Sequence, residues 1–311
     1  MFTKTFKQLS KNDVSIAGGK GASLGEMINN KVPVPDGFVV LAPAFDKFLE
    51  ETDLGVEIEA IMHNLNYQNI KVVDKISNKI KDLINDALFP SDIAEEILKA
   101  YLKLNVKYAA VRSSATAEDS SIASWAGELE SYLNVSKENL LDSVKKCWAS
   151  LFTPRALFYR FERKLNKTKI SVAVVVQKMI QSEIAGICFT AHPVTKDYGQ
   201  MVIEAGWGLG ESVVGGKITP DTYVIHKGSW KILDKNISKQ EMMIVKDKNA
   251  NIEKDVPKSK QEKQKLSDNK ILQLAKLCQK IENHYKKPQD IEWALSKNKL
   301  YIVQSRPITT L

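Results

Sequence analysis

The segment 289–307, QDIEWALSKNKLYIVQSRP, constrains the fold more than any other stretch of the chain. Two runs of alternating polar and apolar residues flank the polar segment SKNK, a pattern typical of an antiparallel β-hairpin. If the turn centres on Asn298, Glu292 lies opposite Gln304 and Asp290 lies opposite Arg306. Because alternate residues of a strand share a face, these four polar side chains are expected together on one face. The opposite, core-facing set is expected to be Ile291, Trp293, Leu295, Tyr301 and Val303.

The polar face of this hairpin has side chains suited to magnesium and phosphate. Carboxylate and amide oxygens are hard ligands, and Mg²⁺ commonly takes one or two such protein groups. An arginine beside them can bind a phosphate through two parallel hydrogen bonds. An exposed polar face with a surface ion pair would show the same residues. The pattern alone therefore leaves both interpretations open.

Composition and charge indicate a soluble globular chain. Of the 311 residues, 43% are hydrophobic and 26% are charged, which excludes a collagen-like or wholly disordered protein. No apolar run reaches the roughly 18 residues of a membrane helix, and the N-terminal residues lack the apolar core of a signal peptide. The three cysteines are far apart, which argues against a disulfide framework or a cysteine-rich zinc site. A cytoplasmic location without membrane attachment is expected.

Periodicity predicts an α+β fold with two or three lobes. Residues 44–104 are rich in helical patterns, and a further helix is expected after Ser267. The polar, lysine-rich stretch 246–265 is expected to be an exposed loop. Strands are expected at 38–41, 108–115, 129–135, 170–180, 184–190, 201–206, 222–226 and 241–245. The net charge of +8 comes from lysines scattered over the chain, so a solvated surface is favoured over a nucleic-acid groove.

Two glycine-rich segments have the composition of ligand loops. GGKGAS at 18–23 is not a Walker A motif because Val14 stands where glycine is required. Backbone N–H groups at a helix start beside Lys20 could still bind an anion, although an ordinary helix-start turn is an equal alternative. GWGLGESVVGGK at 206–217 fails as a dinucleotide fingerprint because Glu211 replaces the third glycine, and a close-packed loop is expected there.

Two other polar segments are candidate sites. Arg112 leaves a strand in VRSSATAED at 111–119, where it could contact a phosphate; a flexible surface loop is the alternative. His192 precedes a proline in FTAHPVT, which favours a turn residue over a catalytic one. The four histidines show no metal-binding spacing.

Seven segments, taken in order, resemble a known family. They are GGKGASLGEM, PVPDGFVV, VRSSATAED, CWASLFTPRALFYR, VVVQKMI, GWGLGESVVGGKITPDTYVI and DIEWALSKNKLYIVQSRP. Together they resemble the N-terminal ATP-binding domain of phosphoenolpyruvate synthase and its relatives, pyruvate phosphate dikinase and rifampicin phosphotransferase. The resemblance spans essentially the whole chain, and seven ordered segments are far more specific than any one of them.

The resemblance implies an ATP-grasp fold in which lobes close over ATP. It implies a lobe or lobes at residues 1–180, with the glycine-rich and Arg112 loops, and a C-terminal lobe at 181–311 with the metal-binding hairpin. The implied ATP contacts are phosphate binding by Lys20, Arg112 and Arg306, coverage of the nucleotide by Gly127 and Ser131, and adenine recognition by Gln177. Glu292 and Gln304 would hold Mg²⁺, Asp290 would support them, and Arg112 and Arg306 would be the catalytic residues.

The resemblance also implies a phosphotransferase of the dikinase type that passes an ATP phosphate to a histidine. No Thr-Ser-His type phosphohistidine motif is found in the chain, so this histidine is expected on a separate carrier domain or subunit, with pyruvate as the final acceptor. The chain departs from the family pattern at two positions. Glu128 stands in the segment SWAGELE at 124–130, and His192 stands where relatives usually have Asn or Asp before proline. The alternatives are the ATP-binding part of a rifampicin phosphotransferase, acting on a rifampicin-like drug, a non-catalytic ATP-sensing module, and a basic nucleic-acid binder.

Overall fold

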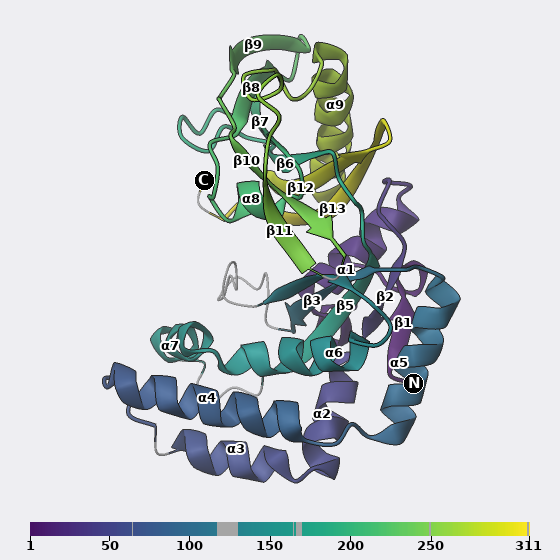
Figure 1. The fold of residues 1–311 in the computed structure, drawn as a ribbon, viewed down its shortest axis with the longest axis vertical. Coiled ribbons are helices and arrows are strands. Elements are labelled where there is room, and N and C mark those ends of the chain that lie inside the picture. The colour runs from purple at the N-terminus through teal and green to yellow at the C-terminus, as the bar shows by residue number, and fades with distance from the viewer. Residues whose placement is uncertain (64, 117–129, 164, 166–169, 249, 310) are drawn as a thin grey trace. The chain divides into compact units, whose positions relative to one another are not determined.

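The computed structural model describes residues 1–311 with the exception of 64, 117–129, 164, 166–169, 249 and 310. The chain forms two compact units, Met1–Glu26 with Asp36–Met179 and Met27–Pro35 with Ile180–Leu311. The second unit thus includes Met27–Pro35, which the sequence-based boundary assigned to the first. Each unit combines helices with a large antiparallel sheet, which confirms the expected α+β class (Figure 1).

The first unit is built on a five-stranded sheet in the order β1-β2-β5-β3-β4. β5 is apolar except at Gln177 and Lys178 and is buried except at Lys178, as expected of a central strand whose two faces are covered. The strands are β1 (Thr3–Thr5), β2 (Gly37–Val40), β3 (Ala109–Ala115), β4 (Ser131–Val135) and β5 (Val172–Lys178).

Helices cover one face of this sheet and form its main hydrophobic core. In Figure 1, α6, α4 and α3 lie in successive layers on this side. Trp148 of α6 is fully buried against the rings of Phe45, Phe48 and Phe89, and burial of each such ring contributes about 2–3 kcal/mol. The helices are α2 (Ala42–Glu51), α3 (Leu54–His63), α4 (Ile70–Asp86), α5 (Ser91–Leu104), α6 (Leu140–Ala149) and α7 (Pro154–Glu162).

The second unit is built on a six-stranded sheet in the order β13-β12-β6-β7-β8-β9. The helix α9 (Asp268–Tyr285) covers one face, and its N-cap is Ser267, as predicted. The Cys188 thiol of β6 lies against Cys278 of α9 inside this core. The strands are β6 (Ile184–Phe189), β7 (Gln200–Trp207), β8 (Asp221–His226), β9 (Lys231–Asn236), β12 (Gln289–Ser296) and β13 (Lys299–Pro307).

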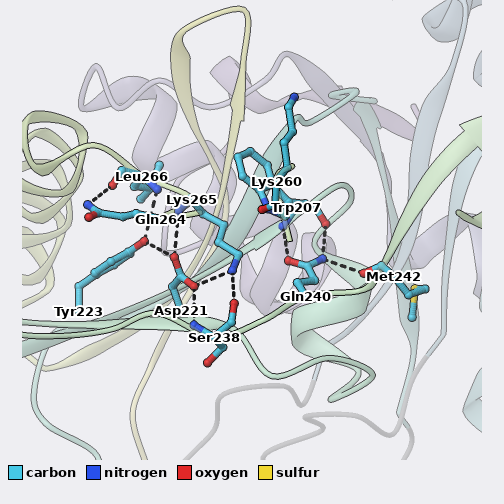
Figure 2. Close-up of polar contacts among 10 residues, drawn as sticks. All are labelled: Trp207, Asp221, Tyr223, Ser238, Gln240, Met242, Lys260, Gln264, Lys265 and Leu266. Atoms are coloured by element: carbon cyan, nitrogen blue, oxygen red, sulfur yellow. Dashed lines mark hydrogen bonds and ion pairs between the residues drawn. The ribbon is translucent and has the colours of Figure 1, made fainter. Parts of the chain in front are cut away.

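The expectation that 246–265 is an exposed loop is wrong in two respects. Residues 250–255 form β11 (Ala250–Asp255), which pairs with β10 (Met242–Asp247) in a separate hairpin. Lys265 is buried, and its Nζ lies 2.7 Å from Oδ1 of Asp221, with both side chains wholly inaccessible (Figure 2). Asp221 also accepts bonds from the Tyr223 hydroxyl and the Ser238 N–H. The stretch is therefore pinned to β8 by a buried ion pair whose hydrogen bonds offset its desolvation.

A second polar contact holds the end of β7 in place. The Gln240 side chain accepts from the Trp207 N–H at 2.8 Å and donates to the carbonyl oxygens of Trp207 and Met242 (Figure 2). Lys260 lies over the Trp207 ring, and the indole N–H donates to the Lys260 carbonyl oxygen. These contacts fix the loop that follows β7.

Candidate functional site

The C-terminal hairpin has the predicted residue pairs but a different turn. Glu292 pairs with Gln304 and Asp290 pairs with Arg306, as the sequence indicated. The turn is formed by Lys297 and Asn298, with φ of 47° and 61°, between the paired residues Ser296 and Lys299. Positive φ at both positions is the geometry of a type I′ turn, which matches the twist of the flanking strands.

A β-bulge reconciles this tighter turn with the predicted pairs. The register shifts between Glu292 and Trp293, and Trp293 pairs with Ile302, so Val303 is an extra residue in β13. The core face of β13 therefore consists of Ile302 and Ser305, which are buried. The expectation that Tyr301 and Val303 face the core is wrong, because it ignored this extra residue; both are only partly buried.

The polar face of the hairpin combines a possible metal pair with an oriented guanidinium. Arg306 donates from Nε and from Nη2 to Oδ2 of Asp290, at 2.9 and 2.6 Å. The Asp290 side chain is 13% exposed and that of Arg306 is 34% exposed. Asp290 therefore fixes the direction of Arg306. Glu292 and Gln304 supply one carboxylate and one amide oxygen on directly paired positions, a donor set that fits Mg²⁺ with its remaining positions filled by phosphate and water.

Sequence reasoning missed Glu204, a third carboxylate on the same face of the sheet. Glu204 of β7 pairs with Ile187 of β6, and Ile187 pairs with Glu292. Gln304, Glu292, Ile187 and Glu204 therefore form one row across four strands, and all four are partly buried. Burial and then the charge of Asp290 raise the pKa of Glu204 above its usual value. The only sequence signal was a single carboxylate within the otherwise apolar run MVIEAGW.

In the first unit, the glycine-rich segment forms a kinked helix with Lys20 just after the kink. α1 (Val14–Asn29) is interrupted at Gly18, where φ is 68° and ψ is 173°. A side chain at Gly18 would lie 2.2 Å from Oγ of Ser114, so this close approach requires glycine. The Ser114 hydroxyl accepts from the Gly21 N–H and donates to the Ala17 carbonyl oxygen. The helix restarts after Gly18, which gives Lys20 the helix-start position expected from the sequence.

Three further predicted residues share the other face of the five-stranded sheet, the one without the large helical core. Arg112 of β3 pairs directly with Ser131 of β4, and Val175 follows on β5. Gln177, two residues further along β5, is on the same face and only 2% exposed. Gly127, expected over the nucleotide, and Glu128 lie outside the described residues. The first unit thus brings Arg112, Ser131 and Gln177 to one sheet face.

The segment after β7 is a packed structural loop, as expected. Gly208 has a φ of +91°, and a Cβ there would lie 2.5 Å from the Ile244 carbonyl oxygen of β10. The Leu209 N–H donates to that same oxygen, and α8 (Glu211–Val214) follows. Glycine is needed here for a close backbone approach.

His192 is a turn residue, in agreement with the favoured interpretation of FTAHPVT. Its Nδ1 accepts hydrogen bonds from the N–H groups of Val194 and Thr195, at 3.3 and 3.2 Å. Asparagine and aspartate side chains accept from the same positions in turns. The imidazole therefore substitutes for the Asn or Asp expected at this position.

The chain belongs to the family described as pyruvate phosphate dikinase, AMP/ATP-binding domain, which matches residues 14–311. Membership confirms the resemblance inferred from the seven segments and, with it, an ATP-grasp fold in an ATP-binding phosphotransferase family.

Three relatives illustrate the relationship. The protein named "Probable phosphoenolpyruvate synthase" of Methanocaldococcus jannaschii is 47% identical over 100% of this chain and 27% of its own length. Phosphoenolpyruvate synthase of Pyrococcus furiosus is 43% identical over 100% of this chain and 44% of its own. Rifampicin phosphotransferase of Bacillus subtilis is 38% identical over 98% and 35%. The chain thus spans less than half the length of these relatives.

The described residues contain neither a membrane-spanning helix nor a cluster of metal-binding side chains. None of their helices is both long enough and apolar enough to cross a membrane. No group of three or more His, Cys, Asp or Glu side chains among them has the arrangement of a metal centre. The second finding is compatible with a magnesium site of one carboxylate and one amide, which contains fewer such groups.

Proposed function

We propose that this chain binds Mg-ATP and donates a phosphoryl group to a histidine of a separate carrier domain or subunit, with pyruvate as the final acceptor. The observation that carries the proposal is the hairpin, in which Glu292 pairs with Gln304 and Asp290 orients Arg306. Membership of an AMP/ATP-binding family supports ATP as the nucleotide that binds. The reduced, buried cysteines are compatible with a cytoplasmic enzyme.

In this proposal the chain acts by positioning and by charge. Lys20 and Arg112 bind phosphate oxygens, Ser131 and Gly127 cover the nucleotide, and Gln177 contacts the adenine. Glu292 and Gln304 hold Mg²⁺, which neutralises phosphate charge when bound. Arg306, held by Asp290, stabilises the charge of the transferring group together with Arg112. Phosphoryl transfer requires little acid–base chemistry from the protein, so no general base is assigned.

The identity of the final acceptor rests on the relatives alone. Those named phosphoenolpyruvate synthase are more similar to this chain than the Bacillus subtilis relative named rifampicin phosphotransferase, at 47% and 43% against 38% identity. We therefore favour pyruvate over a rifampicin-like drug. Supplying the carrier domain of each kind and detecting phosphohistidine would distinguish the two.

Substitutions in the hairpin can distinguish Mg-ATP binding from phosphoryl transfer to the carrier histidine. Glu292→Ala and Gln304→Ala should each weaken Mg-ATP binding by roughly tenfold or more, because a proposed ligand of the metal is lost. Arg306→Ala should reduce phosphohistidine formation by about 10³-fold, with a smaller effect on affinity. Calorimetry measures the first effect and transfer to a supplied carrier domain measures the second. Unchanged Mg-ATP affinity in both metal-site variants would refute the metal assignment.

A further inference from the structure

Glu204 is a partly buried carboxylate without a partner in the described part of the chain. No described residue donates a hydrogen bond to it or forms an ion pair with it, and its surroundings act on it through burial and through the charge of Asp290. By contrast, Asp290 on the same face accepts two bonds from Arg306. An acceptor that loses water without gaining a donor is destabilising, so a ligand that brings donors would relieve this cost.

The sheet register fixes where such a ligand must lie. Glu204 is separated from Glu292 by the single strand β6, at Ile187. Two strand spacings amount to about 10 Å, so the backbone positions of Glu204 and Glu292 are about that far apart, a distance that one bound small molecule can span. The opposite face at these positions is closed, because Ile203, Cys188 and Ile291 are fully buried. A ligand of Glu204 therefore occupies the same open face as the metal and phosphates.

We propose that the Glu204 carboxylate accepts hydrogen bonds from the ribose hydroxyls of the bound nucleotide and so selects ribonucleotides over deoxyribonucleotides. This inference rests on the proposed function, since it assumes that a nucleoside triphosphate binds at Glu292 and Gln304.

The chemistry of the donors supports ribose. An ionised carboxylate only accepts hydrogen bonds, and the vicinal hydroxyls of ribose present two donors side by side. Acidic side chains bind ribose hydroxyls in the same way in dinucleotide-binding proteins. The sugar is also the part of the nucleotide joined to the phosphates, which makes it the nearest donor along the ligand.

The experiment measures Mg-ATP and Mg-2′-deoxy-ATP affinity by calorimetry in the wild type and in Glu204→Gln and Glu204→Ala. Glu241→Gln is the matched control, because Glu241 is an exposed glutamate of the same unit, paired with Lys239. Thermal melting verifies that each variant folds. ATP affinity should fall by roughly 10-fold to 100-fold in Glu204→Ala and less in Glu204→Gln, as expected for loss of hydrogen bonds to a charged group. Affinity for 2′-deoxy-ATP should change much less, and the control should match the wild type.

A third nucleotide separates the sugar from the base. Inosine triphosphate keeps the ribose and lacks the amino group of adenine, so its affinity should fall in Glu204→Ala by the same factor as that of ATP. Equal losses for ATP and 2′-deoxy-ATP, or a loss for ATP that inosine triphosphate does not share, would overturn the ribose assignment. If the wild type bound no Mg-ATP at all, the proposed function itself would fail, an outcome distinct from a failure of the Glu204 inference alone.

Discussion

The two units present opposite charges on the sheet faces that carry their candidate residues. The face of the first unit has Arg112, beside the helix that carries Lys20, whereas the face of the second has Glu204, Asp290 and Glu292. Arg306 on the same face pairs with Asp290. Cationic groups suit phosphate and carboxylates suit a divalent cation. In the proposed function, the first unit therefore supplies phosphate contacts and the second unit supplies the metal ligands.

The units also differ in how their site elements are held. In the first, α1 touches the sheet so closely that only glycine fits at position 18. In the second, charged pairs hold β8 and β13, through Lys265 with Asp221 and Arg306 with Asp290. The packing of the first unit therefore requires that position 18 has no side chain, whereas the second unit requires charged side chains that form ion pairs. Substitutions at Lys265, Gly18 and His192, each with a matched control, test how the site elements of the two units are held.

Loss of the buried ion pair in the second unit should have the largest effect on stability. Lys265→Ala leaves Asp221 buried without its counter-charge, and removal of one partner of such a pair costs about 3–5 kcal/mol. Lys235→Ala is the control, because the Lys235–Asp268 pair is exposed and should contribute less than about 1 kcal/mol. Urea unfolding of both variants measures the difference. Equal stability losses would show that charge pairing does not hold this unit.

A methyl group at Gly18 should have the next largest effect, this time in the first unit. Gly18→Ala combines a positive φ of 68° with a Cβ 2.2 Å from Oγ of Ser114, so we expect a loss of about 2–4 kcal/mol. Gly55→Ala is the control, because its added Cβ would meet no atom closer than 3.7 Å in a helix. That variant should be neutral or more stable by up to about 1 kcal/mol. Thermal unfolding distinguishes them, and a tolerated Gly18→Ala would contradict the close-packing argument.

Replacement of His192 should have the smallest effect. His192→Asn keeps an acceptor for the Val194 and Thr195 N–H groups and should change stability by less than about 0.5 kcal/mol. His192→Ala removes the acceptor and should cost about 1 kcal/mol. Chemical unfolding of the pair measures this difference. A His192→Asn variant as unstable as His192→Ala would mean that the turn needs the imidazole itself.

Local patterns predicted the features that depend on neighbouring residues. Alternation along 289–307 predicted the pairing of Glu292 with Gln304. The glycines around Lys20 predicted a turn running into a helix, and the structure has a kink at Gly18 inside α1. Both features follow from side-chain periodicity and from the unusual backbone freedom of glycine.

Features that depend on distant partners could not be predicted in this way. Lys265 reads as exposed because its partner Asp221 lies 44 residues away, and nothing near Lys265 signals the pairing. The position of Glu204 depends on the register of β7 against β6 and of β6 against β12, which no single strand encodes. The bulge at Val303 leaves no mark on the alternation of the strand.

That bulge separates the arrangement of the hairpin from the count of residues along it. Removing Val303 would leave a regular ladder in which Gln304 still faces Glu292 and Arg306 still faces Asp290. Removing Ser305 instead would turn Arg306 toward the apolar side, although every polar group would remain in the sequence. Homologous hairpins of unequal length can thus present the same polar residues on the same face. Hairpins of equal length can present different residues there, because the outcome depends on where along the strand the extra residue lies.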